Sequence, residues 1–116
     1  MRIIDLRATP SVPINEFDAS GATAHHVGSG GGATHVYVVH FAPGGVIGAH
    51  EAGFDQIFAP VQGSGWAAGA DGMRHPVVVG EAALIQRGEL HAKGSDSGLV
   101  ALMLQVQQLD ASGAAT

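Results

Sequence analysis

Short apolar segments separated by glycine- and proline-rich turns run along the whole chain. Residues 33–42 (ATHVYVVHFA) combine β-branched and aromatic side chains, which predicts a strand that is apolar on both faces. Further strands are predicted around Ile3 and Ile4 and at residues 24–27, 54–61, 66–69, 73–79, 82–86 and 99–107. No segment has a convincing helical pattern. The sequence therefore predicts an all-β fold of about eight strands, either a small antiparallel β-barrel or a double-sheet jelly roll.

The connections between these strands are predicted from their composition. Asp71 and Gly72 supply the positive φ angle of a tight hairpin turn, and residues 62–65 predict another turn. The glycine run at 28–32 and the segment 93–98 (KGSDSG) are predicted to be loops, and the final ASGAAT is expected to fray. Residues 1–20, which include Pro10 and Pro13, predict an N-terminal arm. We expect one domain over residues 1–116, with its barrel core at 33–109.

Composition narrows the classes of partner. Only 13% of the 116 residues are charged, roughly half of the typical share, and the formal net charge is -5. Five scattered Lys and Arg residues cannot form a basic stripe, so nucleic acid is not expected as a partner. The absence of cysteine excludes disulfides, thiolate metal sites and a cysteine nucleophile. No window is apolar enough for a membrane span or a signal peptide, so we expect a cytoplasmic protein.

Strands that are apolar on both faces need cover on both sides. One face of the segment 33–42 can line the barrel, but the other needs the N-terminal arm, a second sheet or another subunit. We expect a homodimer, because two-fold pairing is the commonest way to supply such cover. A monomer covered by its own arm is the alternative.

Two histidines form the candidate site. His50 lies in the stretch 44–63 and His91 in the stretch 80–95, and the even offsets from His50 to Ala52 and Gln56 place all three on one strand face if the intervening turn preserves parity. Converging imidazoles can nucleate a metal site, act as an acid and base around a ligand, or have a structural role only. By contrast, we expect the carboxylates of Glu51 and Asp55 to face water.

The spacing of these residues resembles the two motifs of the cupin superfamily, G(X)5HXH(X)3-4E(X)6G and G(X)5PXG(X)2H(X)3N. The first is matched by Gly44, His50, Ala52, Gln56 and Gly63, and the second by Gly80, Gln86, Gly88, His91 and Ser95. Every spacing matches, and the resemblance spans about residues 34–107. Four positions depart from the pattern, since Ala52, Gln56, Gln86 and Ser95 replace its second histidine, glutamate, proline and asparagine.

The resemblance implies a cupin-like barrel and a function built around its interior. Metal-binding cupins hold a divalent ion with three histidines and a glutamate, so the resemblance implies a weakly held Fe, Mn, Ni, Zn or Co ion on His50, Gln56 and His91. The expected ligand is a small organic molecule, bound either in a metal-dependent enzyme or in a metal-free His/Gln pocket of a non-catalytic binding or sensing module. We assign the pocket lining to Phe54, Phe58, Trp66 and Met103. We expect His40 to be a core or interface histidine, and a role as a further, non-standard ligand is the alternative.

Overall fold

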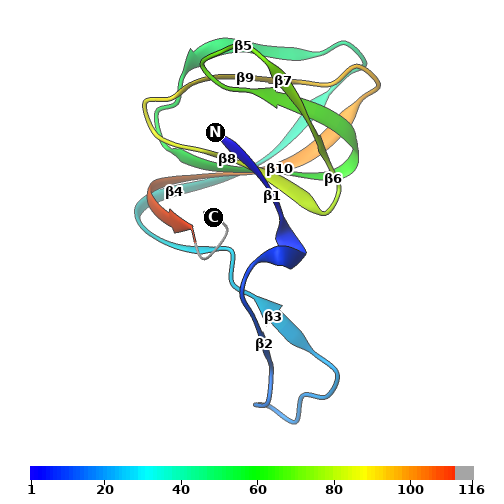
Figure 1. Ribbon diagram of the computed structural model, residues 1–116, viewed down its shortest axis with the longest axis vertical. Coiled ribbons are helices and arrows are strands. Elements are labelled where there is room, and N and C mark those ends of the chain that lie inside the picture. Colours follow the sequence, from blue (N-terminus) through cyan, green and yellow to red (C-terminus); the bar gives the residue numbers. More distant parts are fainter. Residues whose placement is uncertain (112–116) are drawn as a thin grey trace.

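The computed structural model describes residues 1–111 and shows two layers of antiparallel strands that enclose a core (Figure 1). Among these residues there are ten strands and one 3-10 turn. The elements are β1 (Arg2–Asp5), η1 (Leu6–Ala8), β2 (Ser11–Pro13), β3 (Thr23–His25), β4 (Gly28–Phe41), β5 (Val46–Glu51), β6 (Asp55–Ala68), β7 (Arg74–Val78), β8 (Glu81–Ile85), β9 (Leu90–Gly94) and β10 (Leu99–Ala111).

The long strand β6 belongs to both layers. Its first half pairs with β8 and β10 in the order β1-β8-β6-β10-β4, and its second half pairs with β7 and β9, which in turn pairs with β5. All these pairings are antiparallel. The predicted all-β jelly-roll class is therefore confirmed, although residues 62–65 continue β6 instead of forming the predicted turn.

The main core fills the space between the two layers. Phe41 and Phe58 meet edge to face there, with ring centroids 6.1 Å apart. Small side chains on the facing strands, such as Ala67 and Ala101, are fully buried and make room for these rings. The strands β1, β8, β6, β10 and β4 form the lower layer in Figure 1. A second, smaller cluster of Ile4, Ala82 and Leu84 lies on the outer side of this layer, where Leu6 and Val27 pack against it.

The glycine run at 28–32, predicted to be a loop, is part of β4. Gly28, Gly30 and Gly31 lie opposite residues of β10, so the strand reaches further than its β-branched segment. A Cβ atom on Gly30 would come within 2.6 Å of Val106 Cγ1, and only glycine allows this close approach. The prediction was wrong because glycine can serve strand packing as well as turns. The fraying expected for the final residues concerns 112–116, which lie outside the described part of the chain.

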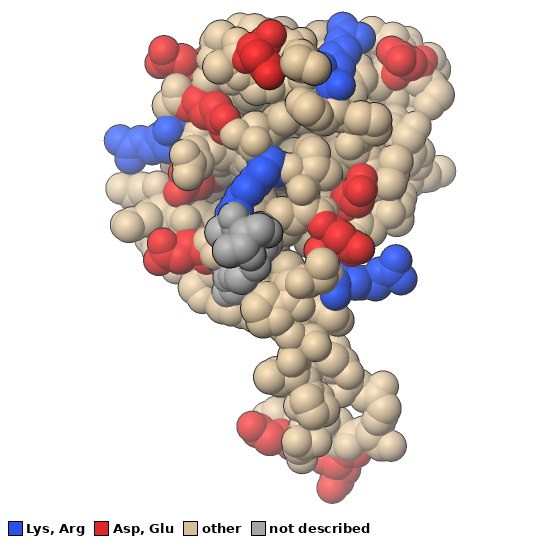
Figure 2. All heavy atoms as spheres, in the orientation of Figure 1, with Lys and Arg blue, Asp and Glu red and all other residues tan. Residues whose placement is uncertain are grey.

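The N-terminal segment forms an arm that leaves the body. After β1, which pairs with β8, the chain runs into the short antiparallel hairpin of β2 and β3 (Figure 1). The hairpin projects from the lower layer, and the molecule measures 46 × 29 × 26 Å. Charged groups are scattered singly over the face shown in Figure 2, with acidic ones at the end of the arm. No helix within residues 1–111 is long and apolar enough to cross a membrane.

Candidate functional site

The two motif histidines lie opposite each other on neighbouring strands. His50 of β5 is the register partner of His91 of β9, and their ring centroids are 4.5 Å apart. His91 is fully buried, whereas His50 is exposed to solvent. The structure thus brings together two residues that are forty-one positions apart in the chain, with one residue inside the barrel and the other at its surface.

Backbone carbonyls orient both rings in the same way. Nδ1 of His50 lies 2.8 Å from the carbonyl oxygen of Gly48, and Nδ1 of His91 lies 3.3 Å from that of Glu89. Because a carbonyl oxygen only accepts, each Nδ1 carries the hydrogen and donates it. This leaves the single lone pair of each Nε2 as the acceptor that the ring offers to its surroundings.

A buried lysine occupies the centre of the site. Lys93 Nζ donates to Gln56 Oε1 over 2.7 Å and lies 3.1 Å from His91 Nε2. Its third neighbour is the sulfur of Met103, 3.6 Å away. Only 2% of Lys93 is exposed, and Gln56 is buried as well. The ammonium group therefore binds two of the three side chains that the sequence motif singled out, His91 and Gln56.

Sequence analysis missed Lys93 because it assigned residues 93–98 to a loop. In the structure Lys93 and Gly94 end strand β9, and Lys93 follows His91 by two positions. Residues two apart on a strand point to the same face. The two-residue spacing from His91 could therefore have placed Lys93 in the site, but the polar composition of KGSDSG favoured a loop.

Burial sets the protonation states of this cluster. Burial lowers the pKa of Lys93 from 10.5 to about 8. Burial, and then the positive charge of Lys93, lower the pKa of His91 from 6.5 to about 4. At neutral pH the lysine is mostly charged and the buried imidazole is neutral, which agrees with an N–H of Lys93 donating to Nε2 of His91.

The four predicted pocket residues do not form one group. Phe58 is fully buried, with its ring centroid 5.4 Å from Lys93 Nζ, and Met103 touches the same ammonium. Phe54 is half-buried and packs edge to face on His35 at 5.4 Å. Trp66 lies apart from the cluster, under the guanidinium of Arg74 at 3.8 Å. Phe58 and Met103 thus border the buried cluster directly, and Trp66 does not.

Two further histidines on β4 lie on opposite faces of that strand. His35 is opposite Gln105, which is opposite Gln56, so His35 shares a row across the sheet with a residue of the candidate site. His40, by contrast, lies on the other face together with Val36 and Val38 and is exposed. The structure therefore places His40 away from the cluster, while His35 is exposed in the row that leads to Gln56.

Comparison with known proteins identifies the fold. No protein-family model matches the chain, and no curated protein is similar to it in sequence. Among solved structures, a cupin-like protein from Thermotoga maritima superposes with a TM-score of 0.60 at 24% identity, over 72% of this chain and 67% of that one. A cupin superfamily protein from Desulfitobacterium hafniense superposes with a TM-score of 0.59 at 13% identity, over 90% and 77%.

This chain has the cupin fold. A conserved protein of unknown function from Streptococcus pyogenes is also similar, with a TM-score of 0.59 at 20% identity, and this chain spans 64% of its length. Such identities show the fold alone. What the cupin barrel holds here has to be argued from its own side chains.

The donor atoms of this cupin barrel do not fit a divalent ion while Lys93 keeps its position. Nε2 of His91 has one lone pair, and an ion at about 2.0–2.2 Å would need the lone pair that faces the ammonium. The positive charge of Lys93 would also repel a second cation at this distance. Within residues 1–111, no group of three or more His, Cys, Asp or Glu side chains is arranged to hold a metal. The weakly held metal stays a prediction that metal analysis has to test.

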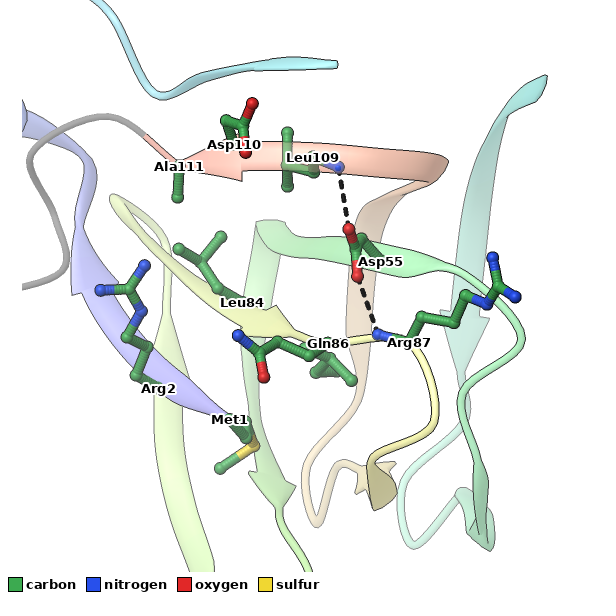
Figure 3. Close-up of a pocket in the computed structure, with 10 residues that line it drawn as sticks. Met1, Arg2, Asp55, Leu84, Gln86, Arg87, Leu109, Asp110 and Ala111 are labelled. Atoms are coloured by element: carbon green, nitrogen blue, oxygen red, sulfur yellow. Dashed lines mark hydrogen bonds between the residues drawn. The ribbon is translucent and has the colours of Figure 1, made fainter. Parts of the chain in front are cut away.

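A cavity of about 530 Å³ lies away from this cluster, between β1, β8 and the end of β10 (Figure 3). On its wall the two carboxylate oxygens of Asp55 accept from the backbone amides of Arg87 and Leu109, each over 2.8 Å. We expected Asp55 to face water, but it is half-buried and joins the loop after β8 to the end of β10. The expectation failed because the amides that donate to this carboxylate come from segments far from Asp55 in the sequence.

Proposed function

We propose that this cupin-fold chain binds a small organic anion without a metal ion, and that the ammonium of Lys93, framed by His91 and Gln56, is the centre of recognition. The observation that supports the proposal is the position of Lys93 Nζ, buried between Gln56 Oε1 at 2.7 Å and His91 Nε2 at 3.1 Å. In this proposal the ammonium group of Lys93 takes the place for which the resemblance implied a bound metal ion.

The charge of Lys93 calls for an anion. Both of its hydrogen-bond partners are neutral at pH 7, and among residues 1–111 the only ion pair within 4 Å joins the N-terminus to Glu89. A buried ammonium without a counterion is costly, because hydrogen bonds to neutral groups replace only part of its hydration. A carboxylate in contact with Nζ would supply the missing charge. The uncompensated positive charge of Lys93 is thus the reason for proposing an organic anion as the ligand.

The contacts of Lys93 also indicate where the ligand oxygen would bind. An ammonium has three donors, and the thioether of Met103 is the weakest of its three acceptors, at 3.6 Å. A carboxylate oxygen that replaced this contact would leave the bonds to Gln56 and His91 in place. The exposed ring of His50, next to His91, then borders the ligand on the solvent side and can accept from a ligand hydroxyl through Nε2.

The proposal is tested by calorimetry with acetate, lactate and benzoate as probes, using metal-analysed protein purified without a nickel column. We expect at least one carboxylate to bind wild-type protein that contains under about a tenth of an equivalent of transition metal, and Lys93→Met to weaken its binding at least tenfold. Arg87→Met, which removes an exposed positive charge, serves as the matched control and should bind as wild type does.

Two results would contradict the proposal. One is stoichiometric uptake of Fe, Mn, Ni, Zn or Co by the wild type that His50→Ala abolishes, which would favour the metal-dependent alternative. The other is carboxylate binding that survives Lys93→Met unchanged.

A further inference from the structure

The outer face of strands β4 and β10 is apolar and exposed. In the register of the sheet, Val36 lies opposite Leu104, and Val38 lies opposite Leu102. Val36 is 63% exposed and Val38 is 60% exposed, although both sit in the middle of a 14-residue strand. When one face of a sheet is in water, the residues along each strand alternate between apolar side chains toward the core and polar side chains toward the water, so an apolar outer face departs from the pattern of a solvated surface.

Charge is absent from this face as well. Residues 33–49, 56–70 and 97–109 contain no Lys, Arg, Asp or Glu, although they supply most of three adjacent strands, β4, β10 and β6. Strand β4 is also the last in its row, and within residues 1–111 no other strand pairs with its free edge. Proteins normally protect such an edge with charges, proline or a covering segment. Residues 33–42 have none of these.

The arm is a second apolar surface without cover. Val12 is 63% exposed and Phe17 is 91% exposed, and both belong to the β2–β3 hairpin segment. A two-stranded hairpin is marginal in water when nothing packs on it. The hairpin projects from the same layer that carries β4 and β10, and it points away from the body, so it does not cover this face of its own chain (Figure 1).

We propose that a second copy of the chain covers this face, with the β4–β10 faces of two copies stacked about a two-fold axis and each arm lying along the body of its partner. A two-fold interface uses the same patch on both copies, and a charge-free patch matches itself without like-charge repulsion. Stacked sheets lie about 10 Å apart, and the arm projects along the longest dimension of the molecule, 46 Å against 29 and 26 Å, so in this pairing it runs beside the partner.

The exposed area is consistent with this pairing. The chain exposes 6633 Å², whereas a compact monomer of its mass, 11.7 kDa, exposes roughly 5,900 Å². The difference is of the same order as the roughly 800 Å² per partner that a standard interface removes from water. The uncovered sheet face and the projecting arm are the features that add accessible surface area of this size. The pairing is independent of the proposed ligand, since none of these residues touches Lys93.

Analytical ultracentrifugation of the full chain tests the pairing. We expect the wild type to sediment at twice its chain mass at about 10 µM, and Val38→Lys to sediment at the chain mass, with a dissociation constant raised at least a hundredfold by two facing lysines. Val79→Lys is the matched control, because Val79 is similarly exposed at 56% but lies in the turn after β7, and this variant should stay dimeric. Equal thermal midpoints for the two variants would show that Val38→Lys does not act by unfolding the chain.

A second pair of variants tests the arm. Phe17→Ser should raise the dissociation constant about tenfold, whereas Met73→Ser, at another exposed apolar position (62%), should leave it unchanged. A wild type that is monomeric at about 100 µM would overturn the whole proposal. Dimers that tolerate Val38→Lys would overturn the assignment to this face, and a neutral Phe17→Ser would overturn the role of the arm.

Discussion

Replacing Lys93 by methionine removes a buried ammonium while keeping a side chain of similar length, and its effect on stability should depend strongly on pH. In the folded protein the pKa of Lys93 is lowered to about 8 by burial, whereas the unfolded chain retains the ordinary pKa of 10.5. Between these values the unfolded state binds more protons than the folded state. The stability of the wild type should therefore rise as the pH increases through this range, and that of Lys93→Met should not.

The size of the effect follows from the pKa difference. Each pKa unit is equivalent to about 1.4 kcal/mol, so the wild type should gain about 3 kcal/mol over the variant between pH 7 and pH 10.5. At pH 7 two effects of the substitution oppose each other. Loss of the buried charge stabilises by about 3 kcal/mol, whereas the buried acceptors Gln56 Oε1 and His91 Nε2, left without their donor, cost about 1–3 kcal/mol each. The variant should therefore lie between about 1 kcal/mol more stable and about 3 kcal/mol less stable than the wild type.

Urea denaturation at a series of pH values measures this difference. Trp66 is the only tryptophan and is 8% exposed, so its fluorescence reports unfolding of the barrel. The pKa of His91 depends on Lys93, but the values of about 4 and 6.5 both lie below this pH range, and the other titrating groups are common to both proteins and cancel in the comparison. The matched control Arg87→Met removes an exposed positive charge and should give a flat difference. A difference between wild type and Lys93→Met that stays constant within about 0.5 kcal/mol would refute the buried position of the ammonium.

Three further predictions concern substitutions in strands β9, β6 and β4. Lys93→Ala should free two donor atoms for a metal, so Co²⁺ binding, absent or weak in the wild type, should become measurable by visible absorption; unchanged Co²⁺ affinity would contradict the competition argued above. Asp55→Ala should lose about 2–3 kcal/mol in urea denaturation because two backbone amides lose a charged acceptor, whereas Glu16→Ala in the exposed arm should be near neutral. Gly30→Ala should cost about 1–3 kcal/mol through its clash within the sheet, and Gly31→Ala, with open space around its Cβ, should change the thermal midpoint little; equal effects would refute the packing role of Gly30.

Much of the fold could be predicted from local pattern. Alternating and double-sided apolar segments located most of the strands of the body, and the spacing of glycines around His50 and His91 indicated the cupin fold. These features are local because strand parity and turn chemistry depend on neighbours in the chain. The glycine run at 28–32 was the exception, since the closeness of Val106 that makes glycine necessary at position 30 comes from a strand far along the sequence.

The candidate site, too, could be predicted only in part from the sequence. The motif spacing predicted that the two imidazoles would converge, although neither β5 nor β9 was among the predicted strands, and their register includes an irregularity between Ile47 and His50. Only the tertiary structure showed that the side chain of Lys93 lies between His91 and Gln56. Lys93 is charged and lies in a polar stretch, so its burial depends on acceptors that β6 and β9 supply together and on the ring of Phe58 beneath it. A buried charge is stabilised by groups converging from several strands, and that convergence is a property of the folded barrel that no short stretch of sequence contains.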